Sequence, residues 1–146
     1  MIYIMRHGQT EANRTGILQG RIDVPLNEEG IKQAEKTKNE LDKKGVSFDF
    51  VYSTYDSLLN RGSQFLLDLS KNEKLKDKNV LVLSHGALIH ALLMYVDKLK
   101  LADIWKQPIG NCGYFVVDFL DGEFKRIDSD FKEMNRIHIF SKRIDE

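Results

Sequence analysis

The sequence has little of the material from which disulfide frameworks and membrane spans are built. It contains one cysteine and two prolines among 146 residues. Because the single Cys112 cannot form an internal disulfide, and because charge arrives at Arg6 before a secretory apolar region can develop, we expect a reduced, cytoplasmic protein. The longest strongly apolar run, residues 87–96, is far shorter than the roughly 20 residues that span a bilayer. We therefore predict no membrane helix.

An excess of charge of either sign is also missing. Lys plus Arg and Asp plus Glu both number 22. A net charge near zero removes the electrostatic argument for nucleic acid or another polyanion as a partner, so any anion site must be local. The hydrophobic share of 42% and the charged share of 30% are ordinary for a globular protein. With no repeat and no linker, the length predicts a single domain, residues 1–146.

Short apolar runs alternate with amphipathic stretches along the chain. The runs predict strands and the stretches predict helices, the first of which begins after an Asn27 cap and stops at Gly45. Alternation of this kind predicts an α/β fold, a three-layer sandwich with a mainly parallel sheet. Asp121-Gly122 is typical of a two-residue turn and predicts a C-terminal antiparallel hairpin. The expected strands are 2–5, 48–53, 80–83, 114–119 and 123–127, and the expected helices begin near 28, 58 and 87.

Three predictions concern packing. The first helix should bury a stripe of Ile31, Ala34 and Leu41. His90 lies five residues after His85, so a helix that starts at Ala87 turns it away from His85 and into the core. The last sixteen residues, 131–146, carry apolar positions within basic sequence. They form either a packed terminal segment or a dimer contact, and packing is the first choice.

Two similar polar motifs follow two of the expected strands. Arg6-His7-Gly8 follows the first, and Ser84-His85-Gly86 follows the third. Parallel sheets place their sites at the carboxyl ends of strands, and glycine allows close backbone approach to a ligand. Arginine offers two parallel donors to phosphate oxygens. With Thr10 and Asn13 as neutral donors, the motifs predict phosphoryl recognition with a nucleophilic imidazole.

The extended pattern resembles the histidine phosphatase superfamily, in its cofactor-dependent phosphoglycerate mutase branch. The resemblance covers residues 1–54 and roughly 57–120. It implies a phosphoglycerate mutase-like fold and a phosphohistidine intermediate, with no metal or nucleotide cofactor and a small phosphorylated substrate. The motifs that carry it are Arg6-His7-Gly8-Gln9-Thr10 with Asn13, Leu18-Gln19-Gly20 through Asp23, Pro25-Leu26, Gly30 and Ser84-His85-Gly86.

The same resemblance assigns roles to individual residues. His7 is expected to be the nucleophile and Arg6 a phosphate clamp. His85 is expected to stabilise the transition state, with the amide of Gly86 beside it. The residues expected to line the substrate loop and bind substrate are Thr10, Asn13, Gln19 and Gly20.

The chain departs from the family after residue 54. Family members continue there with a second phosphate-binding arginine and, later, a glutamate that donates a proton, and this chain has neither segment. We interpret this as an internal deletion that leaves a truncated fold without the middle and lid segment. Arg61 is a candidate to replace the arginine, the alternative being a solvated helix residue. Asp56 and Glu11 are candidates to replace the acid.

These observations leave two functions from different classes. The first is a metal-independent hydrolase, a phosphoglycerate mutase-like phosphatase with reduced activity. The second is a degenerate protein that binds a phosphorylated ligand and turns it over slowly or never. Mutase activity is not expected, because the missing lid would open the pocket to water. A homodimer that supplies the missing parts in trans is a third possibility, since a deleted strand leaves an edge available for pairing.

Overall fold

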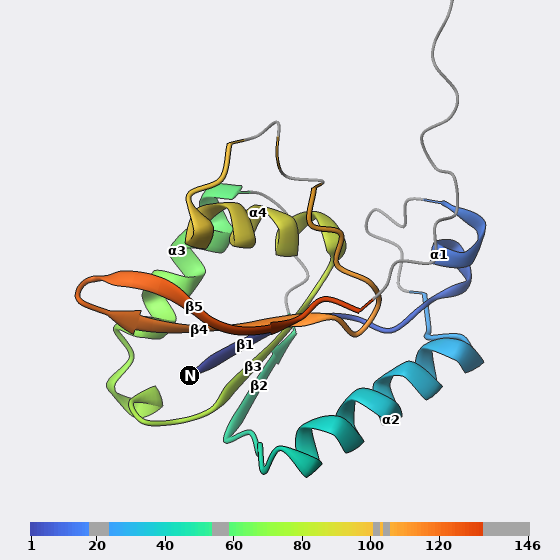
Figure 1. The fold of residues 1–146 in the computed structure, drawn as a ribbon, viewed down its shortest axis with the longest axis horizontal. Helices are drawn as coiled ribbons and strands as arrows, with labels where there is room; N and C mark the ends of the chain where they lie inside the picture. The colour runs from blue at the N-terminus through green and yellow to red at the C-terminus, as the bar shows by residue number, and fades with distance from the viewer. Residues whose placement is uncertain (18–23, 54–58, 101–102, 104–105, 133–146) are drawn as a thin grey trace, which may run out of the picture.

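The computed structural model describes residues 1–17, 24–53, 59–100, 103 and 106–132 (Figure 1). No described helix has the length and apolarity that a bilayer crossing requires. In chain order the elements are β1 (Ile2–Arg6), α1 (Glu11–Thr15), α2 (Glu28–Lys43), β2 (Phe50–Ser53), α3 (Leu59–Ser70), the short 3-10 helix η1 (Glu73–Leu75), β3 (Val80–Ser84), α4 (Gly86–Asp97), β4 (Tyr114–Leu120) and β5 (Glu123–Asp130).

The strands form one five-stranded sheet in the order β2-β3-β1-β4-β5. The predicted α/β class is confirmed. The pairings β2–β3 and β3–β1 are parallel, whereas β1–β4 and β4–β5 are antiparallel. The sheet is therefore evenly mixed in its pairings, and the prediction of a mainly parallel sheet is corrected on this point. The reason is that β4 pairs with β1 in the antiparallel sense, so that the predicted C-terminal hairpin adds two antiparallel pairings to the sheet.

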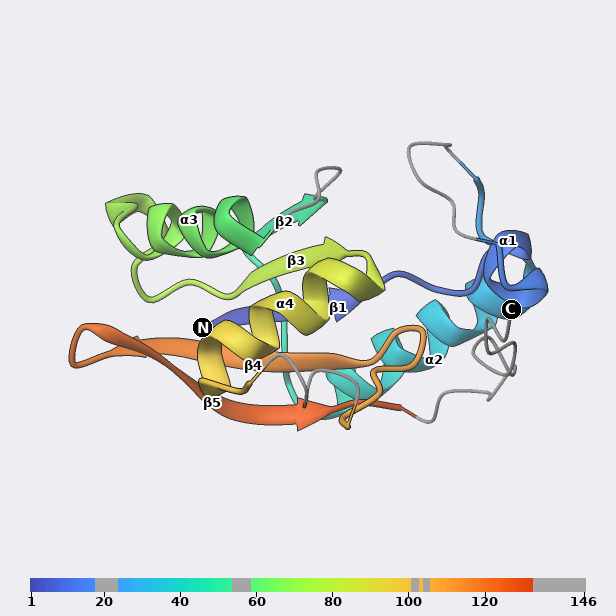
Figure 2. The same cartoon turned by 90° about the horizontal axis from the view of Figure 1, so that it is seen from above.

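Helices cover both faces of the sheet, as a three-layer sandwich requires. Figure 1 shows α3 and α4 on one face and α2 on the other, and Figure 2 shows α4 crossing over β1 and β4. Successive side chains of β1 supply both sides: Ile2 and Ile4 belong to the larger core under α3 and α4, and Tyr3 and Met5 to the smaller core with Leu41 of α2. This alternation follows from the two-residue period of a strand.

Local turn and cap chemistry sets two of the boundaries. The side chain of Asn27 accepts a hydrogen bond from the backbone N–H of Gly30 and caps α2, as predicted. The hairpin turn holds Asp121 at φ 54° and Gly122 at φ 82°. Two consecutive positive φ angles are what a two-residue hairpin turn needs, which is why Asp-Gly stands there.

Side-chain packing departs from the predictions along α2. Leu41 is buried and Ala34 is only partly buried, but Ile31 is 49% exposed, so the predicted buried stripe is wrong at Ile31. The other buried residues of the helix are Gly30 and Thr37. His90 is 2% exposed and lies in α4 as predicted. The choice between a packed tail and a dimer contact falls largely on residues 133–146, outside the described part of the chain.

Candidate active site

The two histidine motifs meet at one edge of the sheet. β1 and β3 are parallel neighbours, and Arg6 pairs with Ser84 at their carboxyl ends. One residue further, the backbone N–H of His7 donates to the Ser84 carbonyl at 3.1 Å. The rings of His7 and His85 then lie with their centroids 5.1 Å apart and their planes at 67°. The two imidazoles are thus close enough to act on one small group.

The ring of His7 is held in one orientation by its neighbour. Its Nδ1 lies 2.7 Å from the carbonyl oxygen of Gly8, and because a carbonyl only accepts, Nδ1 carries the proton. In the neutral ring the lone pair is then on Nε2. Burial lowers the pKa of His7, and the neighbouring His85 and Arg6 lower it further. His7 therefore keeps a nucleophilic Nε2 at neutral pH.

Arg6 is a largely enclosed cation with no carboxylate partner among the described residues. Its Nη1 donates to the carbonyl of Ile109 at 2.8 Å, and its Nε is buried without a hydrogen-bond partner in the described chain. A Cβ on Gly86 would lie 3.4 Å from Cζ of Arg6, so the guanidinium packs against the first residue of α4. A buried charge without a counter-charge is costly, so this arrangement suits an anionic ligand.

The amino end of α4 adds further donors. His85 is the N-cap residue of this 12-residue helix, and its exposed side chain makes no capping hydrogen bond. The first backbone N–H groups of α4 therefore receive no side-chain cap from His85. Because the helix also carries partial positive charge at this end, an anion beside Gly86 would complete the hydrogen bonding.

The loop after His7 is braced by a cap that uses two of the predicted substrate residues. Thr10 and Asn13 form a reciprocal capping box at the start of α1, with both hydrogen bonds at 3.2 Å. Thr10 is 2% exposed. The cap occupies Oδ1 of Asn13 and does not need its Nδ2 donors. The structure thus gives Thr10 a supporting place in the loop, while Asn13 lies nearer the surface.

Asn111 is a residue of the site region that sequence reasoning missed. Its Nδ2 donates to the carbonyl of His7 at 3.0 Å and to Oδ1 of Asn13 at 3.3 Å. The backbone N–H of Cys112 donates to the Arg6 carbonyl at 3.1 Å. No local signal could have found it, because its place follows from the antiparallel pairing of β4 with β1, which puts the turn before β4 where β1 ends.

Two glycines allow α2 to abut the same loop. A Cβ on Gly8 would lie 2.5 Å from the carbonyl oxygen of Gly30, and a Cβ on Gly30 would lie 2.0 Å from that of Gln9. Both distances are too short for any side chain. Gln9 is also tied to α2 through Gln33 and to its cap through Asn27, each at 2.9 Å. Gly8 therefore serves helix packing, beyond the ligand approach that its position in the motif suggests.

The other candidates stand apart from this cluster or outside the described chain. Gln19, Gly20 and Asp56 lie outside the described residues, and Arg61 belongs to α3 with its side chain outside the described part. Glu11 is exposed and ion-paired with Arg14 through both carboxylate oxygens. These hydrogen bonds lower the pKa of Glu11. A carboxylate held ionised in this way is poorly suited to donate a proton.

The described residues offer neither a cluster of metal ligands nor a reactive thiol. Over the described residues, no three His, Cys, Asp or Glu side chains are grouped so as to hold a metal ion. Cys112 is buried, and burial raises the pKa of its thiol to about 11. The thiol therefore stays protonated at neutral pH, which makes Cys112 a packed residue rather than a nucleophile.

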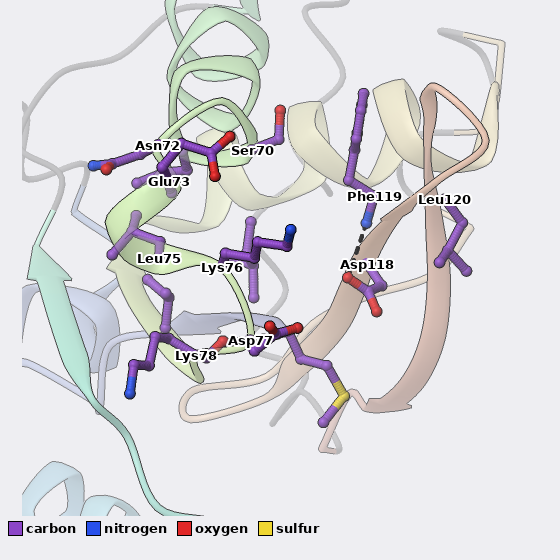
Figure 3. A pocket seen from close by; sticks show the side chains of 14 residues that line it. Ser70, Asn72, Glu73, Leu75, Lys76, Asp77, Lys78, Asp118, Phe119 and Leu120 are labelled. Atoms are coloured by element: carbon purple, nitrogen blue, oxygen red, sulfur yellow. Dashed lines mark hydrogen bonds between the residues drawn. The ribbon is translucent and has the colours of Figure 1, made fainter.

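A pocket of about 430 Å³ lies at the opposite end of the sheet (Figure 3). Apolar side chains such as Ile2, Leu75 and Phe119 line it together with Lys76 and Asp118. Ile2 is at the amino end of β1, whereas Arg6 is at its carboxyl end. The pocket therefore does not belong to the histidine cluster.

Comparison with known protein families shows to which family the chain belongs. It matches the histidine phosphatase superfamily (branch 1) over residues 2–61 and again over residues 52–129. Together these segments cover most of the sequence and include both histidine motifs. The protein belongs to the histidine phosphatase superfamily.

Individual relatives agree with this assignment but are matched over only part of their length. A 2,3-bisphosphoglycerate-dependent phosphoglycerate mutase of Hamiltonella defensa subsp. Acyrthosiphon pisum is 34% identical over 74 residues, 51% of this chain and 30% of the relative. A broad-specificity phosphatase of Saccharomyces cerevisiae is 39% identical over 72 residues, 49% of this chain and 31% of the relative. The matched segments thus span less than a third of these two proteins.

Solved structures share the fold over a greater extent. Phosphoserine phosphatase from Entamoeba histolytica in complex with 3-phosphoglyceric acid superposes with a TM-score of 0.75 at 19% identity, covering 90% of this chain and 97% of that one. The alpha-ribazole phosphatase from Shigella flexneri gives a TM-score of 0.70 at 16% identity, with 86% and 94% covered. At such identities the likeness establishes the fold alone.

Proposed function

We propose that this protein is a phosphoglycerate mutase-like phosphatase that hydrolyses a small phosphomonoester through a phosphohistidine on His7. The observation that carries the proposal is a neutral His7 ring, with its lone pair on Nε2, beside Arg6, whose charge has no carboxylate partner in the described chain. Membership of the histidine phosphatase superfamily supports the same chemistry. Relatives named as a broad-specificity phosphatase and a phosphoserine phosphatase point to small phosphorylated substrates.

The proposed reaction has two displacements. First the Nε2 lone pair of His7 attacks phosphorus, a P–N bond forms, and the P–O bond to the leaving group breaks, with the leaving oxygen taking a proton from water or an acid. Water then attacks the phosphohistidine and loses a proton, the P–N bond breaks, and inorganic phosphate and neutral His7 are restored. No metal is required in either step.

In this proposal the neighbours of His7 hold the transferring group. Arg6 and the backbone N–H groups that begin with Gly86 neutralise the phosphoryl oxygens, and His85 stabilises the charge that develops in the transition state. Asn13, with Thr10 behind it, and the segment of Gln19 and Gly20 bind the rest of the substrate. Arg61 is the proposed second phosphate-binding arginine.

We further propose that activity is reduced because the middle and lid segment of the single domain is missing. The match to the family in two segments that meet and overlap at 52–61 supports this reading. Loss of a positioned general acid costs about 10²–10⁴ in rate, and Glu11, paired with Arg14, is a poor replacement. A substrate with a good leaving group would suffer least, because its leaving oxygen needs no proton.

The second candidate is a protein that binds a phosphorylated ligand without turning it over. The engagement of Glu11 by Arg14 favours it, because binding needs Arg6 and the start of α4 but no proton donor. A mutase ranks below both, since it must shelter a phosphorylated intermediate from water.

Hydrolysis of p-nitrophenyl phosphate in EDTA, with the wild type and His7→Ala side by side, tests the proposal. Lys76→Ala is a matched control, because it removes a charged side chain at the far end of the sheet. We expect turnover by the wild type and by Lys76→Ala, and none above background by His7→Ala. Arg61→Ala should turn over more slowly than the wild type. Equal rates in wild type and His7→Ala would refute the phosphatase.

The binding alternative is separated from the enzyme by inorganic phosphate. Phosphate that raises the melting temperature of the wild type but not of Arg6→Ala, without any hydrolysis, would identify a binding protein.

A cytoplasmic location and a homodimer remain part of the proposal. Light scattering over a concentration series tests the homodimer, which predicts twice the mass of the 16.9 kDa chain.

A further inference from the structure

Arg6 is held between two separate parts of the fold. On one side its guanidinium packs against Gly86, the first residue of α4. On the other its Nη1 donates to the carbonyl of Ile109, in the segment that leads into β4. The position of the guanidinium therefore depends on how α4 and the 107–109 segment are spaced. Nothing in the Arg6 side chain itself determines that spacing.

His90 lies between the same two parts. Its Nδ1 is 2.6 Å from the carbonyl oxygen of Gly86, so Nδ1 donates and the ring is held against the first turn of α4. The backbone of Gln107, two residues before Ile109, lies close enough to the ring to raise the pKa of His90, against the larger lowering by burial. The side chain is 2% exposed. One rigid ring therefore bridges both supports of Arg6.

Core packing alone does not require a polar side chain at position 90. The neighbouring buried positions of α4, Ile89 and Leu92, are filled by aliphatic side chains. An imidazole in the same environment loses its hydration. Because this loss disfavours the charged form of the ring, burial lowers the pKa of His90. Leucine would fill similar space without that cost, but it has no donor for Gly86 and no polar contact with Gln107.

We infer that His90 is a positioning residue, which places the guanidinium of Arg6 for phosphate by tying the first turn of α4 to the 107–109 segment. The inference rests on the proposed function, because it assigns His90 a part in phosphate binding through Arg6. It replaces the simpler prediction that His90 only fills the core. His90 itself does not contact the substrate.

The test compares His90→Leu with Val96→Ala. Val96 is a buried residue near the far end of the same helix, so its truncation weakens the core without touching Gly86 or the 107–109 segment. The readout is the dissociation constant of inorganic phosphate in EDTA, measured by calorimetry well below the melting temperature of each variant. Melting temperatures report the purely structural cost of each change.

We expect His90→Leu to weaken phosphate binding about tenfold, which is about 1.4 kcal/mol, because it misplaces the charged hydrogen bonds of Arg6. Val96→Ala should lower the melting temperature but leave the phosphate dissociation constant unchanged. His90→Asn, which can still donate to Gly86, should fall between His90→Leu and the wild type. It also carries the comparison if His90→Leu does not fold.

An unchanged phosphate affinity in both position-90 variants, with binding still lost in Arg6→Ala, would overturn the inference and leave the proposed function standing. Equal weakening in His90→Leu and Val96→Ala would also overturn it, because a general loss of packing would then explain both. Absence of phosphate binding by the wild type would overturn the inference together with the proposed function.

Discussion

The two ends of the sheet contrast in how their charged groups are satisfied. At the amino end, around the 430 Å³ pocket, the terminal amine of Met1 donates to the Lys78 carbonyl, and Lys78 pairs with Asp49. At the carboxyl end Arg6 has no carboxylate partner in the described chain and keeps a buried Nε without a hydrogen bond. The pocket marks where there is space, whereas unmatched charge marks where an anion belongs. The proposed function therefore places the chemistry at the carboxyl end of the sheet.

The largest expected effect of this contrast is on the catalytic rate, and it separates two cations, Arg6 and Lys76. Arg6→Ala should lower kcat/KM for p-nitrophenyl phosphate by about 10²–10³, the typical cost of removing one transition-state donor. Lys76→Ala at the pocket should leave kcat/KM unchanged. Steady-state kinetics in EDTA measures both. A comparable loss in Lys76→Ala would show that the contrast between the two ends does not correspond to function.

A second expected effect is on stability at the amino end. Leu75 of η1 is 8% exposed and lines the pocket, so Leu75→Ala should lower the free energy of unfolding by about 2–5 kcal/mol. Urea denaturation measures this loss. Phosphate affinity below the unfolding transition should stay at the wild-type value. Weaker phosphate binding in Leu75→Ala would mean that the two ends are coupled.

A third expected effect is the titration of His7. Because burial, His85 and Arg6 lower the pKa of His7 from its ordinary 6.5, the folded ring stays neutral to a lower pH than the unfolded ring. Its contribution to stability is therefore complete above about pH 6.5 and is lost as the pH falls. Titration of the His7 ring signals by NMR should give a midpoint below that of the denatured chain. Arg6→Ala should raise this midpoint, and a midpoint at or above 6.5 in the wild type would contradict the cause given.

The smallest expected effect is at an ion pair of the hairpin. Lys125 and Asp121 lie 3.2 Å apart with exposures of 49% and 90%. Such pairs contribute at most about 1 kcal/mol and are screened by salt. Lys125→Ala should therefore change the free energy of unfolding within that range and leave phosphate binding intact. A larger loss in urea denaturation would show that the hairpin depends on this pair.

Sequence patterns predicted the larger elements because their signals are local. The apolar run of β1, the Asn27 cap of α2 and the Asp121-Gly122 turn each act within a few residues. The short helices α1 and η1 were missed, since five and three residues are too few to show a helical period. Ile31 was misassigned because spacing gives the face of a helix but not how closely that helix approaches the sheet.

Nonlocal contacts explain the remaining differences. The sequence did not indicate that β4 pairs with β1, and this pairing is what brings Ile109 and Asn111 to Arg6 and His7. Helical phase correctly placed His90 in the core, but it could not show that the ring lies near the backbone of Gln107. Each of these contacts joins residues that are far apart along the chain or in different elements.

Residue type and local pattern were enough to predict the strands and to choose the groups that we propose to react. Imidazole, guanidinium and glycine at a strand end have the same chemistry in any α/β fold. Burial of both faces of one sheet decided which groups become neighbours and where a cavity remains. It also decided which charge has no carboxylate partner in the described chain. Burial is a property of the whole chain, because apolar surface leaves water only when distant segments pack together. The 5.1 Å between the rings of His7 and His85 is a result of that packing.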